Sequence, residues 1–192
     1  MEKKTFMSLR EMLRAGLMAA LTGVLAWVQI PLPFSPVPIT GQTFGVMLAG
    51  SLLGARTGFI SMLLFLLLGT AGVPVFAGAK AGIGVLLGPT GGYLLAFPLA
   101  AYIIGRIACP PRGASGLMRM GWANLIGGIL VIYTMGTIQL ALVANMDLST
   151  AFVAGSLYFI PGDLLKVVVA AAVASRVRAI IPHFKLEGKG EG

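Results

Sequence analysis

Long apolar runs alternate with short polar or basic stretches along the whole chain. A helix needs about 20 predominantly apolar residues to cross a bilayer. We predict six membrane-spanning helices, at residues 15–30, 43–53, 57–70, 93–109, 122–144 and 151–181. The second and third of these are short, so they reach across only where the bilayer thins or adjoining loop residues extend them.

Two of the connecting stretches have an unusual composition. Residues 31–42, PLPFSPVPITGQ, hold four of the 11 prolines and cannot form a regular helix. We expect a stiff, extended loop there that acts as a lid over a cavity. Residues 71–92, AGVPVFAGAKAGIGVLLGPTGG, are rich in glycine, which permits turns and close backbone approach. Both stretches are expected to be ordered loops on the outer side of the membrane.

Composition agrees with this pattern and narrows the class of protein. Hydrophobic residues make up 57% of the 192 and charged residues 10%, whereas about a quarter of a soluble domain is charged. We therefore predict an all-α integral membrane protein with one domain over residues 1–192. The single cysteine, Cys109, and the single histidine, His183, argue against a disulfide or a metal site.

The net charge of +8 reflects membrane topology and not nucleic-acid binding, because the basic residues flank the apolar segments. With six spans and the N-terminus inside, 12 of the 14 lysines and arginines lie on the cytoplasmic side. They are Lys3, Lys4, Arg10, Arg14, Arg56, Arg106, Arg112, Arg119, Arg176, Arg178, Lys185 and Lys189. Both termini are therefore predicted to be cytoplasmic. Lys80 is the exception outside, and Lys166 lies within the membrane.

Asp163 and Lys166 are the formal charges inside the last apolar segment, between Asp147 and Arg176. Three residues apart, they share one face of a helix. Charges in hydrocarbon are costly, so they face the bundle interior and pair with one another. Such a pair is either a structural link between helices or a polar clamp at the floor of a pocket for a small polar ligand. We expect Pro161 to loosen the helix beside it.

Small residues crowd the first predicted helix. Ala15 and Ala19 lie four residues apart, as do Gly16 and Ala20, which makes flat strips where another helix can approach closely. Packing inside the protein is the simplest interpretation of such strips.

Four motifs together resemble those of the biotin transporter BioY family. They are VPITGQT at 37–43, GVPVFAGAKAG at 72–82, GPTGGYL at 88–94 and PGDLLK at 161–166, and they occur in the family's order. Members of this family are the substrate-binding S components of energy-coupling factor (ECF) vitamin transporters. Some have an asparagine near positions 79–80, where this chain has Ala79 and Lys80.

The resemblance implies the six-helix ECF S-component fold, high-affinity binding of biotin from outside, and a multi-pass location in a prokaryotic cell membrane. It implies as partners a transmembrane T component and two cytoplasmic ATPase subunits. It also places the family's coupling surface on Ala15 and Ala19, so this strip is expected to meet the T component. No cofactor is implied, and the chain is expected to be a transport subunit and not an enzyme.

The predicted site combines polar and aromatic residues. Asp163 can accept a ureido N–H of biotin, and Lys166 can donate to either the ureido oxygen or the carboxylate. Aromatic side chains are expected to wall the apolar part of the ligand. The candidate site residues are Asp163, Lys166, Phe34, Gln42, Thr43, Phe76, Lys80, Tyr93 and Tyr133.

Two other functions compete with this one. A self-contained secondary transporter or channel would use Asp163 and Lys166 for gating or proton coupling, but the sequence shows no inverted repeat and no second acidic residue within the spans. An intramembrane enzyme would need a nucleophile with its base, or a set of metal ligands, and neither pattern occurs within the spans.

Overall fold

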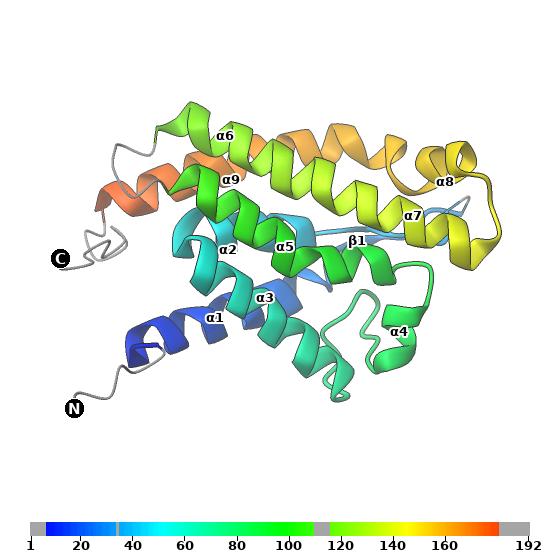
Figure 1. The fold of residues 1–192 in the computed structure, drawn as a ribbon, viewed down its shortest axis with the longest axis horizontal. Helices are drawn as coiled ribbons and strands as arrows, with labels where there is room; N and C mark the ends of the chain where they lie inside the picture. The colour runs from blue at the N-terminus through cyan, green and yellow to red at the C-terminus, as the bar shows by residue number, and fades with distance from the viewer. Residues whose placement is uncertain (1–6, 34, 110–115, 181–192) are drawn as a thin grey trace.

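In the computed structural model, which describes residues 7–33, 35–109 and 116–180, long helices run side by side along the long axis of the molecule (Figure 1). The helices are α1 (Leu9–Leu25), α2 (Gln42–Leu53), α3 (Ala55–Thr70), α4 (Ile83–Leu87), α5 (Gly91–Ala108), α6 (Leu117–Leu125), η1 (Ile126–Val131, a π-helix), α7 (Ile132–Ala144), α8 (Leu148–Gly155), η2 (Leu157–Phe159, a 3₁₀ turn) and α9 (Ile160–Ile180). The strands are β1 (Gln29–Ile30) and β2 (Ile39–Thr40).

Local sequence accounts for several helix boundaries. Ser8 caps α1 in a reciprocal arrangement with Glu11, which satisfies backbone N–H groups that have no partner inside the helix. Gly54 separates α2 from α3 with a backbone φ of 80°, a conformation that favours glycine. Asn145 ends α7 in the left-handed conformation, with φ of 52°.

The six predicted spans correspond to α1, α2, α3, α5, the continuous rod α6–η1–α7, and the pair α8–α9. Helix α5 lies centrally and packs against α2, α3 and α7, while α9 packs against α2 and α6. The π-helical stretch η1 contains Gly127 and Gly128, and Gly127 lies against Ile104 of α5. Small residues at this point let the rod approach its neighbours closely.

The last predicted span is broken, contrary to the expectation of one helix over 151–181. Helix α8 ends at Gly155, and Ser156 adopts non-helical angles before the turn η2 leads into α9. The Ser156 hydroxyl is hydrogen bonded to that of Thr137 on α7, at 2.8 Å. Pro161 lies in the first turn of α9, where backbone N–H groups have no helical acceptor in any case. The expectation that this proline loosens the helix is therefore wrong.

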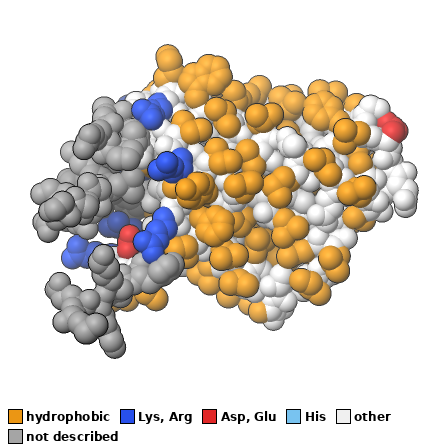
Figure 2. Space-filling model, in the orientation of Figure 1, with side chains coloured by type: hydrophobic (Ala, Val, Ile, Leu, Met, Phe, Trp, Pro, Cys, Tyr) orange, Lys and Arg blue, Asp and Glu red, His pale blue; other side chains and the backbone are white. Residues whose placement is uncertain are grey.

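The outer surface of the bundle is apolar between two polar ends (Figure 2). Large hydrophobic side chains point outward, including Leu142 at 73% exposure and Leu165 at 65%. Three segments of the described chain are long and apolar enough to cross a membrane: Gly91–Ala108, Leu117–Ala144 and Leu148–Ile180. Helices α2 and α3 are shorter and apolar, as expected. Such a surface fits lipid and not water.

The proline-rich loop is ordered at its base. Strands β1 and β2 pair antiparallel, with Gln29 opposite Thr40, and the Gly41 N–H donates to the Val28 carbonyl at 2.9 Å. This short hairpin returns the chain to the start of α2. The loop is therefore held against the end of the bundle from which α2 begins.

Ala15 and Ala19 face the interior of this chain. They are 2% and 1% exposed, on a helix that packs against α2 and α3, and the Ala15 carbonyl accepts a hydrogen bond from Ser61 at 2.8 Å. The expectation that these two methyl groups form an outward strip for a partner is therefore wrong for this structure. Ala20 is exposed instead, and a Cβ added to the neighbouring Gly16 would meet no atom within 4 Å.

We predict opposite effects on stability for a bulky substitution on the inward and the outward face of α1. Ala19→Trp forces an indole into a packed interior, where overpacking costs about 1–3 kcal/mol or more, so we expect low folded yield and a lower melting temperature in detergent. Ala20→Trp adds the same side chain to the outward face and should leave the folded yield and the melting temperature unchanged. Equal stability of the two variants would contradict the observed burial.

Candidate functional site

A cavity of about 80 Å³ lies where two loops, residues 31–42 and 71–92, meet α5, α7 and α9. Its walls are mostly apolar, with a few polar groups on one side, which is the usual character of a small-molecule site. The residues that line it are Pro36, Val37, Pro38, Ile39, Thr40, Gln42, Thr43, Ala77, Lys80, Val85, Thr90, Tyr93, Leu94, Phe97, Ile132, Tyr133, Phe159, Asp163 and Lys166.

Asp163 and Lys166 form an ion pair in the first two turns of α9, with 2.6 Å between the ammonium Nζ and Oδ1. This confirms the shared helix face that their spacing predicts. The aspartate side chain is 3% exposed and the lysine side chain 20%. The negative charge lies near the N-terminus of α9, where the helix dipole favours it.

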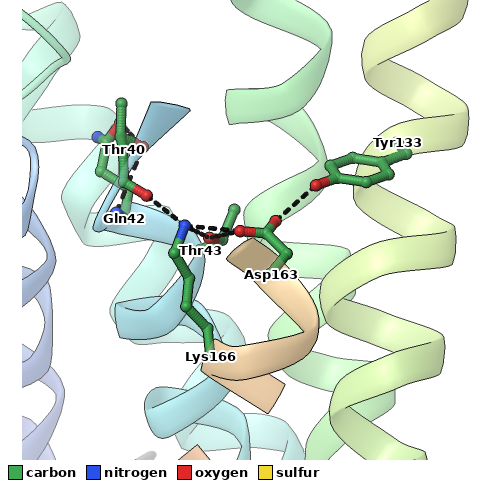
Figure 3. A network of polar contacts seen from close by, with 6 residues as sticks. All are labelled: Thr40, Gln42, Thr43, Tyr133, Asp163 and Lys166. Carbon is green, nitrogen blue, oxygen red and sulfur yellow. Dashed lines mark hydrogen bonds and ion pairs between the residues drawn. The ribbon is translucent and has the colours of Figure 1, made fainter. Parts of the chain in front are cut away.

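The ammonium group of Lys166 has an acceptor for each of its three hydrogens (Figure 3). Besides Asp163, these are the backbone carbonyl of Thr40 at 2.6 Å and the hydroxyl of Thr43 at 3.1 Å. Thr40 belongs to β2 of the hairpin and Thr43 to α2. Lys166 therefore connects α9 to the base of the proline-rich loop.

The Asp163 carboxylate is held from both sides. Oδ1 accepts from Lys166 and from the Thr43 hydroxyl at 3.3 Å, while Oδ2 accepts from the Tyr133 hydroxyl at 2.7 Å. A carboxylate has about four lone-pair directions, so the contacts in the described chain leave one of them, on Oδ2, for a ligand donor. The carboxylate is therefore held in a fixed orientation and can still accept one more hydrogen bond.

Tyr133 lines the cavity, as predicted for an aromatic wall, and has a second role that the sequence did not indicate. Its hydroxyl donates to Asp163 and orients that carboxylate. Its ring meets that of Tyr93 edge to face, with centroids 6.5 Å apart. Tyr93 also lines the cavity, and its hydroxyl donates to the Gly155 carbonyl at 2.8 Å, which ties α5 to the end of α8.

Of the remaining predicted residues, Gln42, Thr43 and Lys80 line the cavity. Gln42 is 2% exposed, and its amide donates to the Val75 carbonyl at 3.4 Å, so it also holds the second loop, residues 71–92. Phe34 lies outside the described residues.

Phe76 does not line the cavity, so its expected role as a ligand wall is wrong. It is fully buried, and its ring packs edge to face on Phe65 of α3 with centroids 5.6 Å apart. A Cβ on Gly69 would lie 2.2 Å from the Phe76 ring, so only glycine fits beside it. Phe76 anchors the second loop to the core.

Sequence reasoning missed several residues of the cavity. Phe97 lies one helical turn after Tyr93 on α5, so helix periodicity could have found it. Phe159 lies in the turn η2, whose existence the sequence did not indicate. The backbone carbonyl of Thr40 leaves no trace in a side-chain pattern. Thr90, Leu94 and Ile132 also line the wall.

Comparisons with known proteins agree on one family. The sequence matches the BioY family over residues 1–183. It is 41% identical over 182 residues to the biotin transporter BioY of Rhizobium etli, covering 92% of this chain and 97% of that protein. It is 40% identical over 172 residues to the probable biotin transporter BioY of Bacillus subtilis, covering 89% and 91%.

The fold agrees as well. A crystal structure at 2.1 Å of the S-component for biotin from an ECF-type ABC transporter superposes with a TM-score of 0.82 and 31% sequence identity. The match covers 89% of this chain and 92% of that structure. Sequence and structure agree over nearly the whole chain, and the chain belongs to the BioY family.

Proposed function

We propose that this chain is the membrane subunit that binds biotin for an ECF-type ABC transporter. Its family, its relatives and the superposed structure all support this function. The observation that carries it is the oriented Asp163–Lys166 pair beside apolar walls in one cavity. Nothing in this role requires catalysis by the chain, because the family consists of transporter components.

The polar side of the cavity suits the ureido ring of biotin. That ring offers two N–H donors and one carbonyl oxygen. The unoccupied direction on Asp163 Oδ2 accepts one N–H, and a hydrogen bond to a charged group is worth about 1.5–3 kcal/mol. Lys166 can serve the ureido oxygen if it releases the Thr40 carbonyl, its one backbone acceptor.

The apolar side suits the sulfur-containing ring and the aliphatic chain of biotin. Tyr93, Leu94 and Phe97 lie on one face of α5, and Phe159 adds a third aromatic ring from η2. Burying apolar ligand surface there contributes about 25 cal/mol for each Å². Apolar contact thus supplies affinity, while the polar cluster selects the ureido group.

Energy for uptake comes from other subunits in this proposal. A transmembrane T component and two cytoplasmic ATPase subunits would complete the transporter, as the superposed S-component belongs to an ECF-type ABC transporter. The half-buried Gly16 and the exposed Ala20 on α1 offer a partner helix close approach, in place of the buried Ala15 and Ala19.

The cytoplasmic side is proposed to be the end where α1 begins and α9 finishes. Lysine and arginine side chains gather at that end of the molecule, and Asp147 lies at the other, where α7 meets α8 (Figures 1 and 2). Basic residues concentrate on the cytoplasmic side of membrane proteins. The cavity then opens toward the outside.

Labelling of intact cells tests this orientation. Val73, after α3, and Gly116, before α6, are both exposed. Each is replaced by cysteine, as Val73→Cys or Gly116→Cys, on a Cys109→Ser background. An impermeant thiol reagent should label the first and not the second, because only the first faces outward. Labelling of position 116 without position 73 would reverse the assignment.

Substitutions in the polar cluster test the ligand. Asp163→Asn and Lys166→Met should each weaken biotin binding by roughly 10- to 100-fold, because each leaves a buried charge without its partner. Tyr133→Phe should cost less, about threefold to tenfold, since Asp163 keeps its ion pair. Titration calorimetry of the purified protein measures all three.

Thr134→Val is the matched control, because Thr134 adjoins Tyr133 but is exposed on the outer face of α7. It should bind biotin like the wild type. Thiamine and riboflavin, which lack the ureido ring, should bind far more weakly than biotin to every variant. Wild-type affinity in both charge variants would remove the pair from the site.

The partner surface has its own test. Ala20→Trp should bind biotin normally yet fail to co-purify with the T component and ATPases, because its indole fills the space that a close helix needs. Uptake driven by ATP should be lost with the complex. Normal uptake by this variant would exclude the outward face of α1 as a close-packed contact.

A further inference from the structure

The second outer loop contains a tight turn that presents Lys80 to the cavity. The Phe76 N–H donates to the Lys80 carbonyl at 3.1 Å, and the residues between include Gly78 and Ala79 with φ of 72° and 56°. Alanine rarely adopts a left-handed conformation, so the surrounding structure fixes this turn. The backbone of Lys80 is therefore held in place.

Both ends of the turn are anchored to α3. On one side, the Phe76 ring is fully buried against Phe65 and Gly69. On the other, the Gly82 N–H donates to the Gly69 carbonyl at 2.7 Å. The lysine side chain thus extends from a rigid base, and its flexible part is its own aliphatic stem.

The two lysines of the cavity differ in what their charges contact. Lys166 is matched by Asp163, and its three donors all have acceptors. Lys80 is exposed and lines the cavity, and none of the hydrogen bonds or ion pairs among the described residues involves its ammonium group. The buried side of the site is therefore internally neutralised, whereas its exposed side carries an uncompensated positive charge.

We propose that Lys80 binds the carboxylate of the ligand and makes the site selective for the free acid over neutral amides. This inference rests on the proposed biotin-binding function. With the ureido ring at the buried Asp163, the aliphatic chain leads away and the carboxylate lies toward the exposed side. A cation there meets the ligand's charge, while Lys166 has no donor to spare without releasing the hairpin. Lys80 is then a determinant of specificity, separate from the ureido cluster.

The experiment compares biotin with biotinamide, in which a neutral amide replaces the carboxylate. Wild-type protein in detergent should bind biotin roughly three- to tenfold more tightly than biotinamide at low salt, the range for a partly exposed charge pair. The difference should shrink at high salt, because ions screen exposed charges. Lys80→Gln should weaken biotin to the affinity of biotinamide and leave biotinamide unchanged, while Lys80→Arg should keep the preference.

The outcomes separate this inference from the function on which it rests. Equal binding of the two ligands to the wild type overturns the role of Lys80 but leaves biotin binding intact. So does a preference for biotin that survives in Lys80→Gln. Failure of the wild type to bind either ligand overturns the proposed function itself. The wild-type comparison needs no variant, so equal binding of the two ligands would overturn the role of Lys80 even if Lys80→Gln folds poorly.

Discussion

The ion pair between Asp163 and Lys166 is the interaction on which the site depends. Moving either charge alone into a low-dielectric interior costs several kcal/mol, and only a close partner with further hydrogen bonds offsets that cost. Here the partners come from α2, α7 and the hairpin as well as α9. Three helices and one loop must therefore be correctly placed before the charges are tolerable. The same groups orient the acceptor that faces the cavity.

The two loops at the cavity, residues 31–42 and 71–92, are held by different means. The second is fixed by packing, with Phe76 inserted beside Gly69 and Gln42 bound to the Val75 carbonyl. The base of the first depends on a two-residue strand pair and on the bond from Lys166 to Thr40. A ligand carbonyl that accepted this ammonium hydrogen would have to displace the Thr40 carbonyl of the loop. One wall of the cavity is thus rigid, and the other is linked to the charge cluster itself.

The family relationship identifies the class of protein, whereas the geometry of the cavity shows which side-chain donors are already in use. Membership in the BioY family rests on residues 1–183 as a whole. It does not say which atoms of this chain meet which atoms of a ligand. The saturated ammonium of Lys166 and the exposed one of Lys80 do bear on that question, since a hydrogen already donated is not free to bind. Lys80 therefore places a second lysine at the exposed side of the cavity, apart from the cluster around Asp163.

The sequence by itself determined the helical membrane fold, the order of its apolar helices and the pairing of Asp163 with Lys166, because hydropathy and helix periodicity act over a few neighbouring residues. It also marked Gln42, Thr43 and Tyr93, which line the cavity. Only the tertiary structure decided that Ala15 and Ala19 face inward, that Phe76 is an anchor, and that Tyr133 orients a carboxylate. These depend on which helix lies opposite. Neither the break at Ser156 nor the Thr40 carbonyl is encoded by a local side-chain pattern, since each is set by partners distant in the chain.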